Sequence, residues 1–313
     1  MSATGLHHRT SESPRFNILE RIREVLSRRE VIGNLIGKEL KVKYKSTVLG
    51  VLWSMLNPLL YLVVFWVVFT VFLPAGIPDF AVFLLSGLLV YTLFSTALAA
   101  GTGSVVDNAS LVTKVAFPRE VLPLAAVGAS LVNFAYQVAV LLLFMVAIGY
   151  DFVGWNLLLV PAGLAVLLLF TTALTMGTSA LNVRYRDTMH LVELSLIAWF
   201  WVTPIVYSAS LVMGRLDVWA QRLYLANPLA PIVLAFQRGL YGYRLAGSCN
   251  DAGVQDALPA RLAELPGCQA VLPDPGLTWY AWRLGLVAVM SLVLIALTWW
   301  VFFRMSGDFA EEL

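Results

Sequence analysis

Charged side chains are scarce in this sequence, and several long stretches have none. Asp, Glu, Lys and Arg make up 13% of the 313 residues, about half their usual share of a soluble domain, whereas hydrophobic residues make up 59%. The stretch from Thr47 to Leu73 contains none of the four charged types. As a helix it can cross a hydrocarbon core of roughly 30 Å, and in lipid only a helix pairs all the backbone groups of such a segment. The composition therefore excludes a soluble globular protein and predicts an all-α protein with several membrane spans.

Catalytic motifs are missing as well. The sequence has no HExxH motif, no GxSxG nucleophile elbow and no carboxylate pair at the centre of a predicted span. Gly33 to Glu39 is only superficially like a phosphate-binding loop, because the glycine spacing is wrong and Glu39 stands where Ser or Thr must hold magnesium. We therefore expect no metal site, no cofactor and no catalytic residue in this chain. It is not expected to be an enzyme or to hydrolyse ATP by itself.

The predicted spans also lack charge at their centres. Glu193 and Arg283 lie near span ends, where a long side chain reaches the membrane surface. Proton-coupled and ion-coupled carriers usually keep ionisable groups at mid-membrane. If the chain moves a substrate, the energy is therefore expected to come from outside the spans.

Six apolar segments are predicted to cross the membrane. They are Thr47–Leu73, Phe80–Ala100, Val121–Ile148, Trp155–Leu181, Leu191–Leu211 and Trp279–Phe303. The short loops that carry Lys114 and Arg119, or Arg184 and Arg186, are predicted to be cytoplasmic, because basic residues accumulate on that side. This gives a cytoplasmic segment 1–46, a membrane domain 47–304 with a long outer loop 213–277, and a cytoplasmic tail 305–313. Both termini are expected inside the cell, and the protein in the cytoplasmic membrane.

Two shorter helices are predicted on the cytoplasmic side. Residues Asn17–Tyr44 place apolar side chains at helical spacing, which is typical of an amphipathic helix at the membrane surface. A solvated helix of a small cytoplasmic domain is the alternative. Residues Ala109–Phe117 form a second short helix that ends at Pro118. It is either a surface on which a partner protein can act or a simple connector.

Aromatic residues gather in two of the predicted spans. The first span carries Tyr61, Phe65, Trp66 and Phe69 on one broad face, and the fifth carries Trp199, Phe200, Trp201 and Tyr207. Aromatic faces inside a membrane path suit sugar rings, whose C–H faces are apolar while their hydroxyls stay hydrated. Contact with lipid is the alternative for each of these residues.

The long outer loop has two notable features. Asn227–Tyr241 is apolar but too short to cross the membrane, so we expect a helix that lies at the outer leaflet or dips into it. Cys249 and Cys268 are the two cysteines of the chain, and both lie in this loop. Outside the cytoplasm they are expected to form a disulfide, with two free thiols as the alternative.

Several separate stretches resemble one family, the permease subunits of ABC exporters for cell-surface polysaccharides such as O-antigen, capsule and teichoic acid. The matching stretches, in chain order, are Glu39–Trp53 with Asn57-Pro58, Lys114–Pro123, Asn182–Asp187 with Thr203-Pro204, Asn227-Pro228, and Phe309–Glu312. They extend over nearly the whole chain. The insert after Gly247, which contains the cysteines, is not part of the family pattern.

The resemblance implies a homodimer of six-span subunits joined to two copies of a separate ATPase subunit, which binds ATP and Mg. It implies that the Asp107–Arg119 loop and the N-terminal interfacial helix receive the motion of the ATPase. The coupling residues it implies at this loop are Asn108, Leu111, Lys114, Phe117, Pro118, Arg119 and Glu120. The first and fifth spans would line the polymer path, through Tyr61, Phe65, Trp66, Phe69, Trp199, Trp201 and Tyr207. The Asn227–Tyr241 segment would close the outer end of this path. A nucleic-acid partner is not expected.

The expected cargo is a polyprenyl-pyrophosphate-linked glycan, either O-antigen-like or a cell-wall galactan. Lys41, Lys43 and Lys45 would attract its pyrophosphate at the inner rim, although they could equally be membrane anchors. Two other functions stay open at this point. One is a related ABC permease for a drug or a lipid, and the other is a membrane-embedded enzyme that acts on lipid-linked sugars.

Overall fold

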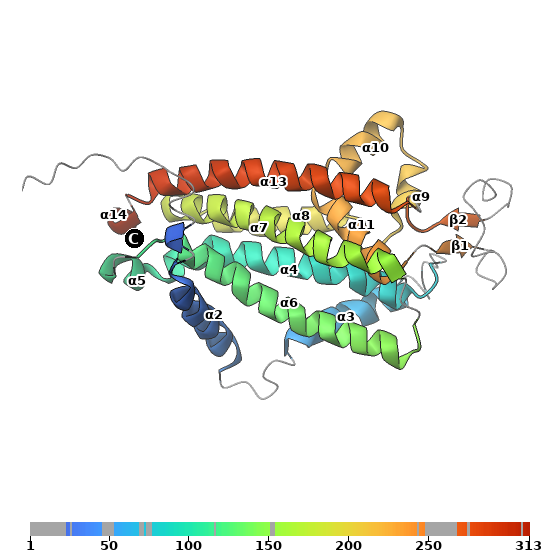
Figure 1. The fold of residues 1–313 in the computed structure, drawn as a ribbon, viewed down its shortest axis with the longest axis horizontal. Coiled ribbons are helices and arrows are strands. Elements are labelled where there is room, and N and C mark those ends of the chain that lie inside the picture. Colours follow the sequence, from blue (N-terminus) through green and yellow to red (C-terminus); the bar gives the residue numbers. More distant parts are fainter. Residues whose placement is uncertain are drawn as a thin grey trace, which may run out of the picture.

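The computed structural model describes residues 23–25, 27–45, 53–68, 72, 77–115, 117–150, 154–242, 244–247, 268–273, 276–307 and 309–313. Figure 1 shows an elongated bundle in which long helices run side by side along the long axis. The long and medium helices are α2 (Arg29–Tyr44), α3 (Trp53–Val67), α4 (Phe80–Asp107), α6 (Val121–Ala147), α7 (Leu159–Arg184), α8 (Thr188–Val202), α11 (Leu229–Leu240) and α13 (Leu277–Met305). The short elements are α5 (Ala109–Lys114), η3 (Gly154–Leu158), α9 (Ala209–Met213), α10 (Val218–Leu225), β1 (Leu245–Gly247), β2 (Cys268–Ala270) and α14 (Phe309–Glu312).

Within the described part of the chain, four helices are long and apolar enough to cross a membrane. They are α4, α6, α7 together with η3, and α13, of 28, 27, 31 and 29 residues. Their residues coincide with the second, third, fourth and sixth predicted spans. Long uncharged runs form helices here because no other structure pairs their backbone groups in lipid. A membrane protein with several spans is therefore confirmed.

The other two predicted spans correspond to shorter helices. α3 has 15 described residues, and residues 46–52 and 69–71 beside it lie outside the described part of the chain. α8 also has 15 residues, and the prediction that its helix continues to Leu211 is wrong. It ends at Val202 because Pro204 disfavours a helical conformation at Thr203, which is extended with φ −98° and ψ 137°. The count of six spans stays a prediction at these two segments.

α4 lies at the centre of the bundle. It packs against α6, α7, α8 and α11, and most of its residues are buried. A helix that is apolar all round is typical of such a central position. Close approach to α7 depends on Gly101, because a Cβ atom at this position would overlap the Cγ2 of Thr175.

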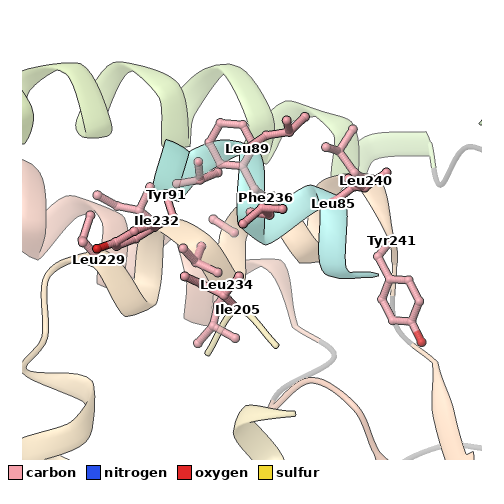
Figure 2. Close-up of a cluster of buried hydrophobic side chains, with 14 of the residues drawn as sticks. Leu85, Leu89, Tyr91, Ile205, Leu229, Ile232, Leu234, Phe236, Leu240 and Tyr241 are labelled. Carbon is pink, nitrogen blue, oxygen red and sulfur yellow. The ribbon is translucent and has the colours of Figure 1, made fainter. Parts of the chain in front are cut away.

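α11 is enclosed by the bundle. All 12 of its residues are buried, and it packs against α4, α7 and α13. Figure 2 shows Ile232, Phe236 and Leu240 of α11 among Leu85 and Leu89 of α4. The sequence predicted a short helix at the surface of the leaflet or dipping into it. The surface position is wrong, because α11 has no exposed face.

A small two-stranded sheet adds to the predicted all-helical fold. β1 and β2 pair antiparallel, with Gly247 opposite Cys268, so the ends of the intervening segment meet. Cys249 lies outside the described residues, as does the side chain of Cys268. The disulfide between them stays a prediction.

Arg244, just before β1, joins three loops at the same end of the bundle. Its Nε donates to the Tyr150 hydroxyl at 3.1 Å, and its Nη1 lies 3.4 Å from the Asp79 carboxylate. The Tyr150 hydroxyl donates in turn to the Tyr241 carbonyl at 2.8 Å. Burial raises the pKa of Tyr150 to about 12, which keeps this hydroxyl protonated and able to donate. The end of α11 is thereby fixed to the α6–η3 turn and to the loop before α4.

We predict that Gly101→Ala destabilises the protein, because the new methyl group overlaps Thr175 in a packed helix interface. The loss should be about 1–3 kcal/mol. Thermal unfolding in detergent, followed by tryptophan fluorescence, measures it. Adding Thr175→Ser, which removes the overlapping methyl group and keeps the hydroxyl, should recover most of the loss. Gly285→Ala is the matched control, since its Cβ would meet open space. Equal melting temperatures for Gly101→Ala and the wild type would contradict this packing.

Candidate functional site

Three groups of residues are candidates for a functional site: a cluster at one end of the bundle, a lysine face on α2, and an aromatic groove between α3, α4 and α8. The first lies where α2, α5 and α14 meet the ends of α7 and α13 (Figure 1). We call it the basal cluster. Its buried members are Val25, Val105, Val112, Leu122, Met176, Ala180, Val183, Trp299, Phe302 and Phe309. Segments from both ends of the sequence therefore share one small core with the short helix α5.

Polar contacts fix the start of α5. Lys38 of α2 donates from Nζ to the Asn108 Oδ1 at 2.7 Å, and the Asn108 Nδ2 donates to the Ser104 carbonyl at 2.9 Å. Asn108 directly precedes α5, so α2, α4 and α5 are joined through one side chain. Gly128 of α6 leaves room for Ile36, which brings α2 against the bundle.

The loop after α5 is held in the basal cluster. Phe117 packs against the cluster, Glu120 is buried, and the Arg119 guanidinium lies 5.8 Å from the ring centroid of Phe309. Phe309 in turn packs edge-to-face on Phe302 at 5.3 Å.

Of the seven residues predicted to receive the motion of an ATPase, Lys114 is the exposed one. Leu111, Phe117 and Arg119 are half-buried, and Asn108, Pro118 and Glu120 are buried. The structure thus divides the predicted set into a surface residue and residues that hold the loop. Lys38 and Phe309, which hold α5 from either side, were missed.

The lysine face of α2 is the second group. Gly33, Asn34, Gly37, Lys38, Lys41, Val42 and Lys45 line an open cavity of about 800 Å³. Lys41 and Lys45 are one helical turn apart and both border it. Lys43, which was predicted to act with them, does not line this cavity, and partial desolvation lowers the pKa of its ammonium group. Helical spacing could have separated Lys43 from the other two.

The aromatic groove is the third group. It is a cavity of about 420 Å³ lined by Tyr61 and Phe65 of α3, by Leu88, Tyr91, Thr92, Ser95 and Thr96 of α4, and by Leu196, Ile197, Phe200 and Trp201 of α8. Phe65 stacks on Tyr61 and on Phe200, each at 6.1 Å. The groove thus brings together side chains of the two predicted aromatic spans.

The α4 wall of the groove carries hydroxyl groups. Thr92 donates to the Leu88 carbonyl, and Ser95 and Thr96 both donate to the Thr92 carbonyl. Because each hydroxyl proton is donated to a backbone carbonyl, the hydroxyl oxygen atoms are available to a ligand in the groove only as acceptors. The groove can therefore accept hydrogen bonds from a polyhydroxylated ligand on one wall and offer ring faces on the other.

Two of the predicted path residues lie away from the groove. Trp199 packs edge-to-face on Phe94 and Phe170, on the inner side of α8. Tyr207 follows the end of α8 and donates to the Trp201 carbonyl at 3.0 Å. The side chain of Trp66 and all of Phe69 lie outside the described residues.

Trp199 instead takes part in a clamp between α8 and α11. Its Nε1 donates to the Asn227 Oδ1 at 2.7 Å, and the Asn227 Nδ2 donates to the Thr203 Oγ1 at 3.0 Å. The same Asn227 oxygen accepts from the Leu229 backbone N–H at 3.1 Å. Further along α11, the Gln237 Nε2 donates to the Pro204 carbonyl at 3.0 Å. The end of α8 is therefore bound to α11 at two places.

Metal ligands do not gather in the described part of the chain: no group of three or more His, Cys, Asp or Glu side chains occurs there that could hold an ion.

Known proteins resemble this chain over most of its length. Residues 30–241 match the family described as ABC-2 type transporter. An O-antigen export system permease protein, RfbA, of Myxococcus xanthus is 36% identical over 225 residues, which cover 72% of this chain and 85% of the relative. Two proteins of the same name from Klebsiella pneumoniae are 31% and 30% identical. These alignments cover 65% and 67% of this chain, and 77% and 81% of the relatives.

We predict that Asn227→Ala loosens the clamp between α8 and α11, because it removes three hydrogen bonds of about 1 kcal/mol each. Hydrogen–deuterium exchange should become faster in peptides that cover residues 203–208 and 229–240. Thr203→Val keeps the side-chain shape and removes the bond to Asn227 and the bond to the Trp199 carbonyl within α8. Because only one of these bonds joins α8 to the α11 segment, the exchange of residues 229–240 should change less than in Asn227→Ala. Unchanged exchange in Asn227→Ala would mean that the clamp does not hold α11.

Proposed function

Since the chain belongs to the ABC-2 type transporter family, we propose that it is the permease, the membrane-spanning subunit, of an ABC transporter that exports a cell-surface polysaccharide. The relatives named as O-antigen export permeases carry this proposal, because the alignment with each of them covers about two thirds or more of this chain. The proposed cargo is a glycan linked to polyprenyl pyrophosphate, either O-antigen-like or a cell-wall galactan.

The aromatic groove supports a sugar polymer as the cargo. Tyr61, Phe65 and Trp201 offer ring faces, and Thr92 and Ser95 offer hydroxyl oxygens. A sugar ring has an apolar C–H face and a hydrated rim of hydroxyls, so both walls of the groove match it. The hydroxyls of this wall already donate to backbone carbonyls, so a purely hydrophobic drug or lipid would leave only their acceptor capacity unused, whereas a sugar would use it. The groove is therefore proposed as part of the polymer path, with α11 closing its outer end.

The proposed assembly is a homodimer of six-span subunits with two copies of a separate ATPase subunit that binds ATP and Mg. Both termini and α2 lie on the cytoplasmic side of the membrane in this arrangement. The ATPase acts on α5, where Lys114 is exposed and the rest of the loop is anchored in the basal cluster. The energy for export then enters through α5 from outside the spans.

The pyrophosphate of the cargo is proposed to approach the lysine face of α2. Lys38, Lys41 and Lys45 border one open cavity there. Gly33 and Gly37 border it too, and open space surrounds both of them. Three ammonium groups around an accessible cavity attract a dianionic group more strongly than scattered lysines do. If the lysines of α2 only anchored the helix at the cytoplasmic surface, each of them would contribute equally.

The first test is to purify the tagged chain in mild detergent from its native membrane. We expect a separate ATPase subunit in stoichiometric amount, and the complex should transport a lipid-linked glycan in vesicles when ATP is supplied. Purification of the chain without an ATPase, even after crosslinking, would contradict the proposal and favour a membrane-embedded enzyme of lipid-linked sugars.

The groove variants Phe65→Ala and Trp201→Ala then test the cargo. Each should lower glycan transport several-fold while the complex still assembles and hydrolyses ATP. Trp282→Ala is the matched control, because this tryptophan is 69% exposed on α13, away from the groove. Two results together would indicate another cargo. The wild type would transport a lipid without sugars as fast as it transports the glycan, and both groove variants would transport the glycan at the wild-type rate.

We predict that Lys41→Gln combined with Lys45→Gln weakens export, because it removes two of the three charges around the α2 cavity. Initial rates of glycan transport at several cargo concentrations should give a higher KM and a less changed maximal rate. Lys43→Gln removes one positive charge from the same helix without touching the cavity, and it is the control for the double variant and for Lys41→Gln and Lys45→Gln made singly. Equal effects of Lys43→Gln and the double variant would indicate simple membrane anchoring.

A further inference from the structure

A cavity of about 310 Å³ lies between α10, the start of α11 and α13. It is at the half of α13 that is remote from α14, where Figure 1 shows α10 standing against α13. Arg222 of α10 and Arg283 of α13 both line it. Apolar side chains complete the lining, among them Leu286, Val287 and Met290 of α13. We call it the α10–α13 cavity.

The two arginines of the α10–α13 cavity have no carboxylate partner among the residues that the structure describes. The cavity lining also contains no Asp or Glu. Arg283 is held in place by Trp279, whose ring centroid lies 5.0 Å from its Cζ atom. A guanidinium group binds phosphate through two parallel hydrogen bonds, so a pair of them around one cavity favours a phosphate ligand.

The rest of the cavity favours a hydrocarbon chain. Leu286 and Met290 follow Arg283 by about one and two helical turns along α13, and both are exposed. With Val289 and Val293 they form an apolar strip that runs from Arg283 toward the middle of α13. A ligand of the α10–α13 cavity can therefore place its charge at the arginines and an apolar chain along this strip.

Tryptophans mark the depth of the arginines in the membrane. Trp219 of α10 and Trp282 of α13 are each 69% exposed, and both lie within a few residues of a cavity arginine. Exposed tryptophan is enriched at the level of the lipid headgroups. In a membrane positioned by these tryptophans, Arg222 and Arg283 lie at headgroup level, and Leu286 and Met290 lie at the level of the acyl chains.

We propose that the α10–α13 cavity binds an anionic phospholipid, with its phosphate between Arg222 and Arg283 and an acyl chain on Leu286 and Met290. In the proposed orientation the lipid belongs to the outer leaflet. It bridges α10 and α13 and covers Pro228 and Pro231, which also line the cavity at the start of α11. The proposal requires that the chain is embedded in a membrane, but it does not depend on which cargo is exported.

Native mass spectrometry of the full-length chain in detergent tests the proposal, with phosphatidylglycerol and phosphatidylcholine as probes. The wild type should retain phosphatidylglycerol in preference to phosphatidylcholine. Arg222→Gln with Arg283→Gln should bind phosphatidylglycerol about tenfold more weakly, since charge-assisted hydrogen bonds are lost. Replacing both arginines by lysine should cost less. Arg215→Gln is the control, because Arg215 is exposed in the same outer segment and does not line the cavity.

A second variant tests the acyl strip. Met290→Trp should fill part of it and weaken phosphatidylglycerol binding while both arginines remain. The melting temperature of each variant in lipid-free detergent should stay near that of the wild type, which separates lipid binding from folding. Three results would overturn the proposal: equal retention of both lipids by the wild type, an equal loss in Arg215→Gln, or displacement of the lipid by inorganic phosphate at similar concentration.

Discussion

The structure depends on one constraint. Where a helix ends inside an apolar bundle, the backbone groups that it leaves unpaired need other hydrogen-bond partners. α8 breaks at Thr203-Pro204, where proline has no backbone N–H to donate. The Pro204 carbonyl accepts from Gln237, and the Thr203 hydroxyl bonds to both Asn227 and the Trp199 carbonyl. The three groups that pair with these polar atoms belong to α8 itself or to the segment that contains α11. The burial of α11 against the end of α8 therefore supplies hydrogen-bond partners to the residues at which α8 ends.

This arrangement links the aromatic groove to the centre of the bundle. Phe200 and Trp201 line the groove, whereas Trp199 between α8 and the core bonds to Asn227. Adjacent residues of α8 thus face in different directions, Phe200 and Trp201 toward the proposed polymer path and Trp199 toward the clamp. A displacement of α8 that widens the groove also pulls on Asn227 and Gln237. In the proposed exporter, the path and the segment that closes its outer end respond to the same movement.

The sequence predicts the long helices well and the directions of individual side chains poorly. α4, α6, α7 and α13 follow from length and lack of charge, because lipid permits no other structure. The end of α8 was misjudged although Pro204 is visible, since the apolar run continues beyond it to Leu211. Trp199 was grouped with Trp201 by composition, yet two residues apart on a helix they face opposite sides. The burial of α11 and the role of Phe309 depend on contacts between distant segments, which a single sequence does not reveal.

The basal cluster holds α5 in place. A six-residue helix has no stability of its own, because its nucleation cost exceeds what so few hydrogen bonds return. α5 is ordered by Val112 in the cluster, by Lys38 at its start, and by Phe309 beneath Arg119. α5 contacts α4 and α14, and Lys38 joins α2 to Asn108 at its start, so a shift of α5 disturbs its contacts with all three helices. In the proposed exporter, a movement of Lys114 would therefore be passed to α2 and, through Phe309 and Phe302, toward the end of α13, which would make the C-terminal segment part of the coupling that we propose.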